Sequence, residues 1–323
     1  MLLGYASIAI TLLIWAGFFL SLKGGAISVL TSADIALTRF LIPSLLLFPL
    51  VYKARHKIAS VPKIYLIGMF IGCGLPYLLV TSSAMQYVPV AQGSALVPGT
   101  LPLFVTMIAV LFFKQPLSHH RIIGFALVIT GIVIFLFTSL TMHEGHTSDS
   151  LIGSETLGQL LFLFASLMWA IFTISARVAN LNALVVAGLV SLMSSILLIA
   201  LIVAGVLPSY LYEQPMTQWP VNELLTHSAI QGVGAGIIAA ASYLYAVQTL
   251  GAERSAAFGS STPVIATLLA IPIFHEVPSI SNWGSLALIC SGSLLASNMF
   301  LKKDTSLDYQ PPAHQAHQAH QAQ

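Results

Sequence analysis

The sequence predicts an all-α integral membrane protein with ten transmembrane helices, arranged as two inverted five-helix repeats. The first observation is composition: charged residues make up 7% of the 323 residues, against about 25% in soluble domains. The second is a series of ten apolar runs, each long enough to cross a bilayer. The third is a segment of the first half that returns in the second half.

Each apolar run is interpreted as one membrane-spanning helix, because about 20 apolar residues cross a hydrocarbon core of about 30 Å. The first run has no basic segment before it and no clear cleavage site, so we expect a retained helix rather than a signal peptide. The predicted spans are, in order, 3–22, 33–52, 64–85, 89–112, 121–140, 155–177, 183–206, 227–248, 252–274 and 281–301.

Lysine and arginine set the orientation, because they are enriched in cytoplasmic loops. The odd-numbered loops contain only Lys23. The even-numbered loops and the C-terminal segment contain Lys53, Arg55, Lys57, Lys63, Lys114, Arg121, Arg177, Arg254, Lys302 and Lys303. This distribution predicts that both termini face the cytoplasm. The expected location is a bacterial inner (plasma) membrane.

Residues 88–135 reappear without a gap at 249–296. The identical pairs are Ala91/Ala252, Ser94/Ser255, Ala95/Ala256, Pro102/Pro263, Thr106/Thr267, Ala109/Ala270, Phe113/Phe274, Ser118/Ser279, Ala126/Ala287, Leu127/Leu288 and Gly131/Gly292. Five helices per copy is an odd number, so the second copy enters the membrane inverted. The basic residues of the loop after the fourth run have lost their charge in the second copy, as an external loop should. Duplicated units of this kind are typical of transporters.

The repeat divides the chain into four parts. We expect a first repeat at 1–140, an external linker at 141–154, a second repeat at 155–303 and a disordered cytoplasmic tail at 304–323. A glycine-rich series at 232–236 is interpreted as a surface for close helix approach.

Short motifs recur at matching places in the two halves. A Trp-Ala pair stands in the first helix of each half, at 15–16 and 169–170, and an Arg-Phe pair stands at 39–40. An Ala-x-x-Ser-Ala motif followed by proline and a short turn occupies 91–118 and 252–279. In these features the chain resembles the drug/metabolite transporter (DMT) superfamily, in particular its ten-helix EamA-type branch.

The resemblance implies a secondary transporter that moves small organic metabolites by alternating access. Efflux of amino acids or related metabolites is the leading expectation. Sugars, nucleosides and drugs stay open, because the family handles all of these classes. Where the family usually has Gly-Glu, this chain has Lys114-Gln115 and His275-Glu276. The lack of a carboxylate at mid-membrane favours facilitated efflux or exchange over proton coupling.

An intramembrane enzyme or a lipid-handling protein is the alternative from another class. Such enzymes need a convergent set of catalytic groups inside the bundle, and here the histidines and carboxylates fall in loops, the tail and helix ends. We therefore expect no enzyme activity, no cofactor and no metal site. The expected partners are a small-molecule substrate and the lipid bilayer, without nucleic acid, for a monomer or homodimer.

The candidate substrate-binding residues are polar or aromatic side chains expected near the bilayer midplane, where such folds bind their substrates. They are Trp15, Phe18, Arg39, Tyr77, Thr100, Trp169, Thr173, Tyr243 and Ser260. Pro102 and Pro263 are expected to break their helices and to act in gating, because proline removes a backbone donor and frees a carbonyl. Packing is the alternative role for these residues.

Arg39 is the one cation well inside a predicted span. A charge at that depth costs at least about 2.5 kcal/mol on insertion scales. Its role is to bind a substrate carboxylate, to line the outer gate or to cap a neighbouring helix. Trp15 and Trp169 occupy matching places, which suits either an apolar or aromatic substrate or helix packing.

Overall fold

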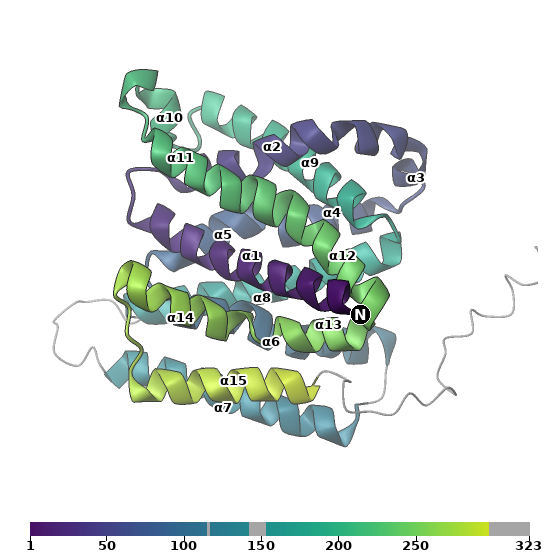
Figure 1. The fold of residues 1–323 in the computed structure, drawn as a ribbon, viewed down its shortest axis with the longest axis vertical. Coiled ribbons are helices and arrows are strands. Elements are labelled where there is room, and N and C mark those ends of the chain that lie inside the picture. Colours follow the sequence, from purple (N-terminus) through teal and green to yellow (C-terminus); the bar gives the residue numbers. More distant parts are fainter. Residues whose placement is uncertain (115–116, 142–152, 297–323) are drawn as a thin grey trace, which may run out of the picture.

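The computed structural model describes residues 1–114, 117–141 and 153–296, and its regular secondary structure in these ranges is entirely helical (Figure 1). The described part contains nine helical segments long and apolar enough to cross a membrane, together with one shorter apolar helix. These coincide in order with the ten predicted spans and confirm the fold class. The predicted tail at 304–323 and nearly all of the linker at 141–154 lie outside the described residues.

Five spans make up each half. Those of the first half are α1 (Leu2–Ala26), α2 (Ser32–Lys53), α4 (Lys63–Cys73) with α5 (Leu75–Met85), α6 (Val90–Phe113) and α7 (His119–Thr141), with the short α3 (Arg55–Ala59) between α2 and α4. Those of the second half are α8 (Ser154–Ala179), α9 (Ala183–Val203), α11 (Val221–His227) with η2 (Ser228–Ile238) and α12 (Ala239–Leu250), α13 (Ala252–Gly259) with α14 (Thr262–Phe274), and α15 (Ile280–Ala296). The link between α9 and α11 carries α10 (Tyr210–Glu213) and η1 (Met216–Gln218).

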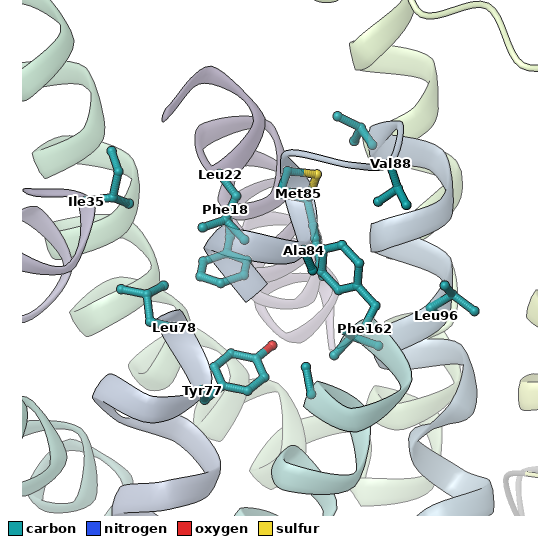
Figure 2. Close-up of a cluster of buried hydrophobic side chains, with 14 of the residues drawn as sticks. Phe18, Leu22, Ile35, Tyr77, Leu78, Ala84, Met85, Val88, Leu96 and Phe162 are labelled. Carbon is teal, nitrogen blue, oxygen red and sulfur yellow. The ribbon is translucent and has the colours of Figure 1, made fainter. Parts of the chain in front are cut away.

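The two halves interleave rather than lying side by side. Three spans pack against the span of equivalent order in the other half: α2 on α9, α6 on α14 and α7 on α15. The first span of each half packs instead on the third span of the other half, α1 on α12 and α4 on α8. Figure 1 shows α7 with α15 at one edge of the molecule and α2 with α9 at the opposite edge. The centre is a continuous cluster of buried side chains from both halves, including Phe18, Tyr77 and Phe162 (Figure 2).

The third span is interrupted in its middle. Gly74 adopts an extended backbone (φ −90°, ψ −153°) between α4 and α5, and Pro76 lies in the first turn of α5. The Leu75 N–H donates instead to Ser194 Oγ of α9, at 3.0 Å. A backbone group freed at this depth needs such a partner, because no water is present in the bilayer core.

The eighth span contains a π-helix, η2, between two α-helical segments. The glycine-rich series lies in this π-helix, and its glycines contact the first half. A Cβ on Gly232 would meet the Thr38 carbonyl oxygen at 2.5 Å, and one on Gly236 would meet the Pro43 ring at 2.5 Å. The predicted close helix approach is therefore confirmed, since any side chain at Gly232 would push η2 away from α2.

The prolines of the fourth and ninth spans behave differently. A turn at 260–261 interrupts the α-helix of the ninth span, although the backbone stays in the right-handed region. Pro263 lies in the first turn of α14, where its missing N–H leaves no bond unmade. The predicted break at Pro102 is wrong, because α6 continues through Pro98 and Pro102. Backbone carbonyl oxygens in this stretch of α6 accept hydrogen bonds from side-chain hydroxyl groups. Thr100 donates to the Leu96 oxygen, and Ser166 of α8 donates to the Val97 oxygen.

Candidate substrate site between the repeats

Arg39 lies in α2 and reaches across to the second half. Its Nη1 donates to the backbone oxygen of Gln231 in η2, at 2.8 Å. Its Cζ lies 5.8 Å from the centre of the Phe18 ring and 5.9 Å from that of Phe40. Among the described residues no carboxylate lies within ion-pair distance of Arg39. Most of its five N–H donors are therefore left for another acceptor.

Asp34, the acid nearest to Arg39 in sequence, is committed elsewhere. It is fully buried and closes a capping box with Thr31 at the start of α2. It also accepts hydrogen bonds from Ser209 Oγ at 2.6 Å and from the Tyr210 N–H at 2.9 Å. Asp34 therefore ties α2 to the α9–α11 link, and Arg39 has no counter-ion in the part of the chain that the structure describes.

Gln231 adds a second unsatisfied polar group in the same region. The side chain is fully buried, and its Nε2 lies 3.3 Å from the Phe18 backbone oxygen. Its Oε1 has no hydrogen-bond partner among the described residues. The π-helix places Gln231 here, and π-helical turns occur frequently at functional sites. The Arg39 guanidinium thus binds the backbone of a residue whose side-chain amide oxygen has no partner among the described residues.

Aromatic rings from both repeats pack together in the same central region. Tyr77 of α5 packs against Trp169 of α8 with ring centres 5.0 Å apart, and Trp169 packs in turn against Phe172 at 5.2 Å. Figure 2 shows Tyr77 and Phe18 in the same central cluster. The packing between the repeats in this region is therefore apolar and largely aromatic, and its Phe18 ring lies next to Arg39.

Trp15 belongs to a second aromatic pair. Its ring lies 5.1 Å from that of Tyr243 on α12, and it also reaches Gly259 at the interruption of the ninth span. The two tryptophans at matching sequence places do not stack on each other. Each contacts a tyrosine contributed by the opposite repeat.

Three predicted site residues lie apart from Arg39 or keep their hydroxyls within their own helix. Thr100 is fully buried and donates to the Leu96 oxygen at 2.5 Å. Thr173 donates to the Trp169 oxygen at 2.8 Å. Ser260 lies 3.4 Å from Ser293 and lines a cleft between the ninth span and α15. The predicted residues that come together are Phe18, Arg39, Tyr77 and Trp169 in one group, and Trp15 with Tyr243 in another.

Two residues of the central region were missed by sequence reasoning. Gln231 is an uncharged amide within a glycine-rich apolar run, and a polar side chain in such a run was the available signal. Cys73 is a single cysteine within an apolar run, and such a residue usually serves only in packing. It lies at the end of α4, half-buried and within electrostatic range of Arg39 and Tyr77.

The model of the EamA-like transporter family matches residues 2–137 and 156–298, once in each half. The chain belongs to the EamA-like transporter family. It is therefore a transporter of the drug/metabolite type, whose family acts on small molecules. One solved structure, described only as "Crystal structure of protein", is 21% identical with a TM-score of 0.57, and the match covers 92% of this chain and 95% of that one. That likeness shows the fold alone, and no curated protein matches the chain.

Proposed function

We propose that this EamA-family protein is a secondary carrier of the bacterial inner membrane that exports small carboxylate-bearing metabolites, such as amino acids, by alternating access. Both termini face the cytoplasm, because the even-numbered loops carry nearly all of the basic residues. The site lies between the repeats, around Arg39, Gln231, Phe18, Tyr77 and Trp169. No catalytic step and no cofactor enter this function.

The unpaired guanidinium of Arg39 is the observation that carries the proposal. A cation inside a membrane span normally pairs with another charge, and marks a substrate or ion pathway. Arg39 has one backbone partner and no carboxylate among the described residues. A substrate carboxylate supplies that missing charge through two parallel hydrogen bonds, the geometry in which guanidinium binds carboxylate best.

The neighbouring groups favour a substrate with two further features. The free Oε1 of Gln231 accepts a hydrogen bond, which suits an ammonium or hydroxyl group beside the carboxylate. The rings of Phe18, Tyr77 and Trp169 suit an apolar or aromatic side chain. Amino acids with such side chains combine all three features. A neutral sugar leaves the guanidinium without a counter-ion.

Counterflow in proteoliposomes tests this function. Vesicles loaded with an unlabelled amino acid and diluted into a trace of the radiolabelled compound should accumulate label transiently, because a carrier exchanges substrates across the membrane. Arg39→Gln should lower the rate about tenfold or more, since it removes a charge-assisted hydrogen bond. Arg55→Gln, at an exposed arginine of α3, is the matched control and should transport normally. Absence of counterflow for amino acids, other carboxylates, sugars and nucleosides alike would refute the carrier function.

A further inference from the structure

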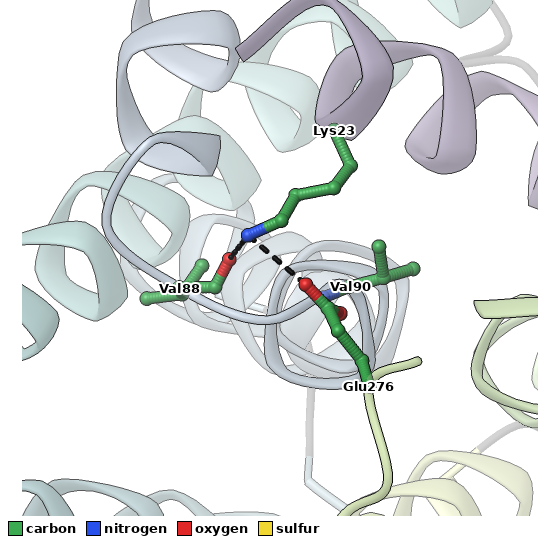
Figure 3. Close-up of polar contacts among 4 residues, drawn as sticks. All are labelled: Lys23, Val88, Val90 and Glu276. Atoms are coloured by element: carbon green, nitrogen blue, oxygen red, sulfur yellow. Dashed lines mark hydrogen bonds and ion pairs between the residues drawn. The ribbon is translucent and has the colours of Figure 1, made fainter. Parts of the chain in front are cut away.

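Three elements meet at the carboxylate of Glu276, directly after α14 (Figure 3). Its Oε1 lies 3.0 Å from Lys23 Nζ, and its Oε2 accepts the Val90 N–H at 2.7 Å. Lys23 Nζ also donates to the Val88 oxygen at 3.1 Å. The Lys23 and Glu276 side chains are only 16% and 20% exposed, so solvent screens this pair less than it screens a surface ion pair.

These contacts join the two repeats. Lys23 lies in the last turn of α1, and Val90 is the first residue of α6, both in the first half. Glu276 belongs to the second half. The N-cap residue of α6 is Pro89, whose side chain forms no cap. The Glu276 carboxylate occupies that position instead, accepting an N–H that has no partner within the helix and interacting favourably with the helix dipole.

All of these residues lie on the side of the molecule where the odd-numbered loops gather, here called the odd-loop side (27–31, 86–89, 204–220 and 275–279). Further contacts cross between the repeats on that side. Thr31 donates to the Pro208 oxygen, and Ser28 donates to the carboxylate of Glu223. In this structure the odd-loop side is therefore held together by polar contacts between the repeats.

The repeat symmetry allows the two sides of the molecule to be compared. Lys114 and His275 end α6 and α14, and both adopt the left-handed conformation, with φ of 51° and 57°. The backbone thus confirms that these two positions correspond. The next residue in each half is Gln115 or Glu276. The second repeat therefore has a carboxylate where the first has a neutral amide.

The cation that pairs with the Glu276 carboxylate has a positively charged counterpart in the other half. Lys23 lies eight residues after Trp15, and Arg177 lies eight residues after Trp169. Each side thus has a cation at the corresponding place, but at the position that follows the helix only the odd-loop side has a carboxylate. A hydrogen bond between charged groups is roughly twice as strong as one between neutral groups. The contact on the odd-loop side is therefore expected to be stronger than the corresponding contact on the other side.

We propose that Lys23 and Glu276 form a charge lock that holds the odd-loop side shut and shifts the resting equilibrium toward the state open on the other side. This inference rests on the carrier function proposed above. Access from the odd-loop side requires α14 to separate from α1 and α6, which breaks the Lys23–Glu276 ion pair and the Val90–Glu276 hydrogen bond together. The neutral Gln115 leaves the other side without an equivalent lock.

Cys73 provides a native reporter for the test, because it is half-buried at the end of α4, where α4 packs against α8 and α9 of the second repeat. The second cysteine is removed by Cys290→Ser, and a charged, membrane-impermeant methanethiosulfonate is applied to vesicles of either orientation. A cysteine at the exposed position 213 identifies the odd-loop side. Glu276→Gln and Lys23→Gln should each speed Cys73 modification from the odd-loop side about fivefold, the lower end of typical coupling between sites. Both should slow it from the opposite side.

Two further variants complete the test. Glu213→Gln, the same change at an exposed acid on the odd-loop side, should leave both rates unchanged. The double exchange Lys23→Glu with Glu276→Lys restores the ion pair but not the Val90 hydrogen bond, and should return the rates part of the way. Unchanged rates in both single variants, or a rise from both sides that indicates general loosening, would overturn the lock. No transported substrate is needed, so this result is independent of the counterflow test.

Discussion

At the scale of single residues, the proposed site depends on two polar groups, the Arg39 guanidinium and the Gln231 amide oxygen. Among the described residues the first has no carboxylate partner and the second has no hydrogen-bond partner. Arg39 was identifiable in the sequence, because a cation inside an apolar run is rare and costly. Gln231 was not, because its position depends on a π-helix that the sequence pattern does not reveal. The hydroxyls of Thr100 and Thr173 look available in the sequence, yet both donate to carbonyls of their own helices. Sequence alone does not show which side-chain hydroxyls already donate to backbone carbonyl oxygens.

Trp169 tests the aromatic part of the site. Trp169→Ala removes the contacts with Tyr77 and Phe172, and should lower counterflow about tenfold with normal protein yield, because aromatic pairs contribute about 0.5–1.5 kcal/mol beyond the area that they bury. Trp169→Phe should retain most of the rate. Trp219→Ala, in the link between α9 and α11, is the control. Transport by Trp169→Ala at the wild-type rate would remove this residue from the site.

At the scale of elements, the spans were predictable and their interruptions were not. Bilayer thickness fixes the length of each apolar run, so all ten spans follow from the sequence. Whether a proline breaks its helix depends on tertiary partners. Pro102 lies inside an unbroken helix whose nearby carbonyls accept from hydroxyls, whereas the third span breaks at Gly74, where Ser194 of α9 accepts the Leu75 N–H.

The contact between η2 and α2 yields a stability prediction. Gly232→Ala puts a methyl group against the Thr38 carbonyl and should lower the melting temperature in detergent, since overpacking costs about 1–3 kcal/mol. Gly284→Ala makes the same change in α15, where nothing lies within 4 Å of the added Cβ. That control should melt at or above the wild-type temperature. Equal melting temperatures for the two variants would show that η2 and α2 are packed less tightly than in this structure.

At the scale of the whole molecule, interleaving of the repeats explains why the site has residues from both halves. The first span of each half packs on the third span of the other half, which brings Tyr77 to Trp169 and Trp15 to Tyr243. The contact between α2 and η2 brings Arg39 to Gln231. The sequence predicts duplication and inversion, because these depend on identity and charge. It does not predict which helices pair, because apolar helix faces carry little information about their partners in a membrane.

The binding site between the repeats is tested most directly by substrate protection of Cys73, which lies at the end of α4 where this helix packs against α8 and α9. In the Cys290→Ser protein, a substrate that undergoes counterflow should slow Cys73 modification, with half-maximal protection near the concentration that half-saturates transport. Arg39→Gln should remove the protection at that concentration without changing the rate in its absence. Undiminished modification of Cys73 at saturating substrate, in a protein that transports it, would contradict a binding site between the repeats.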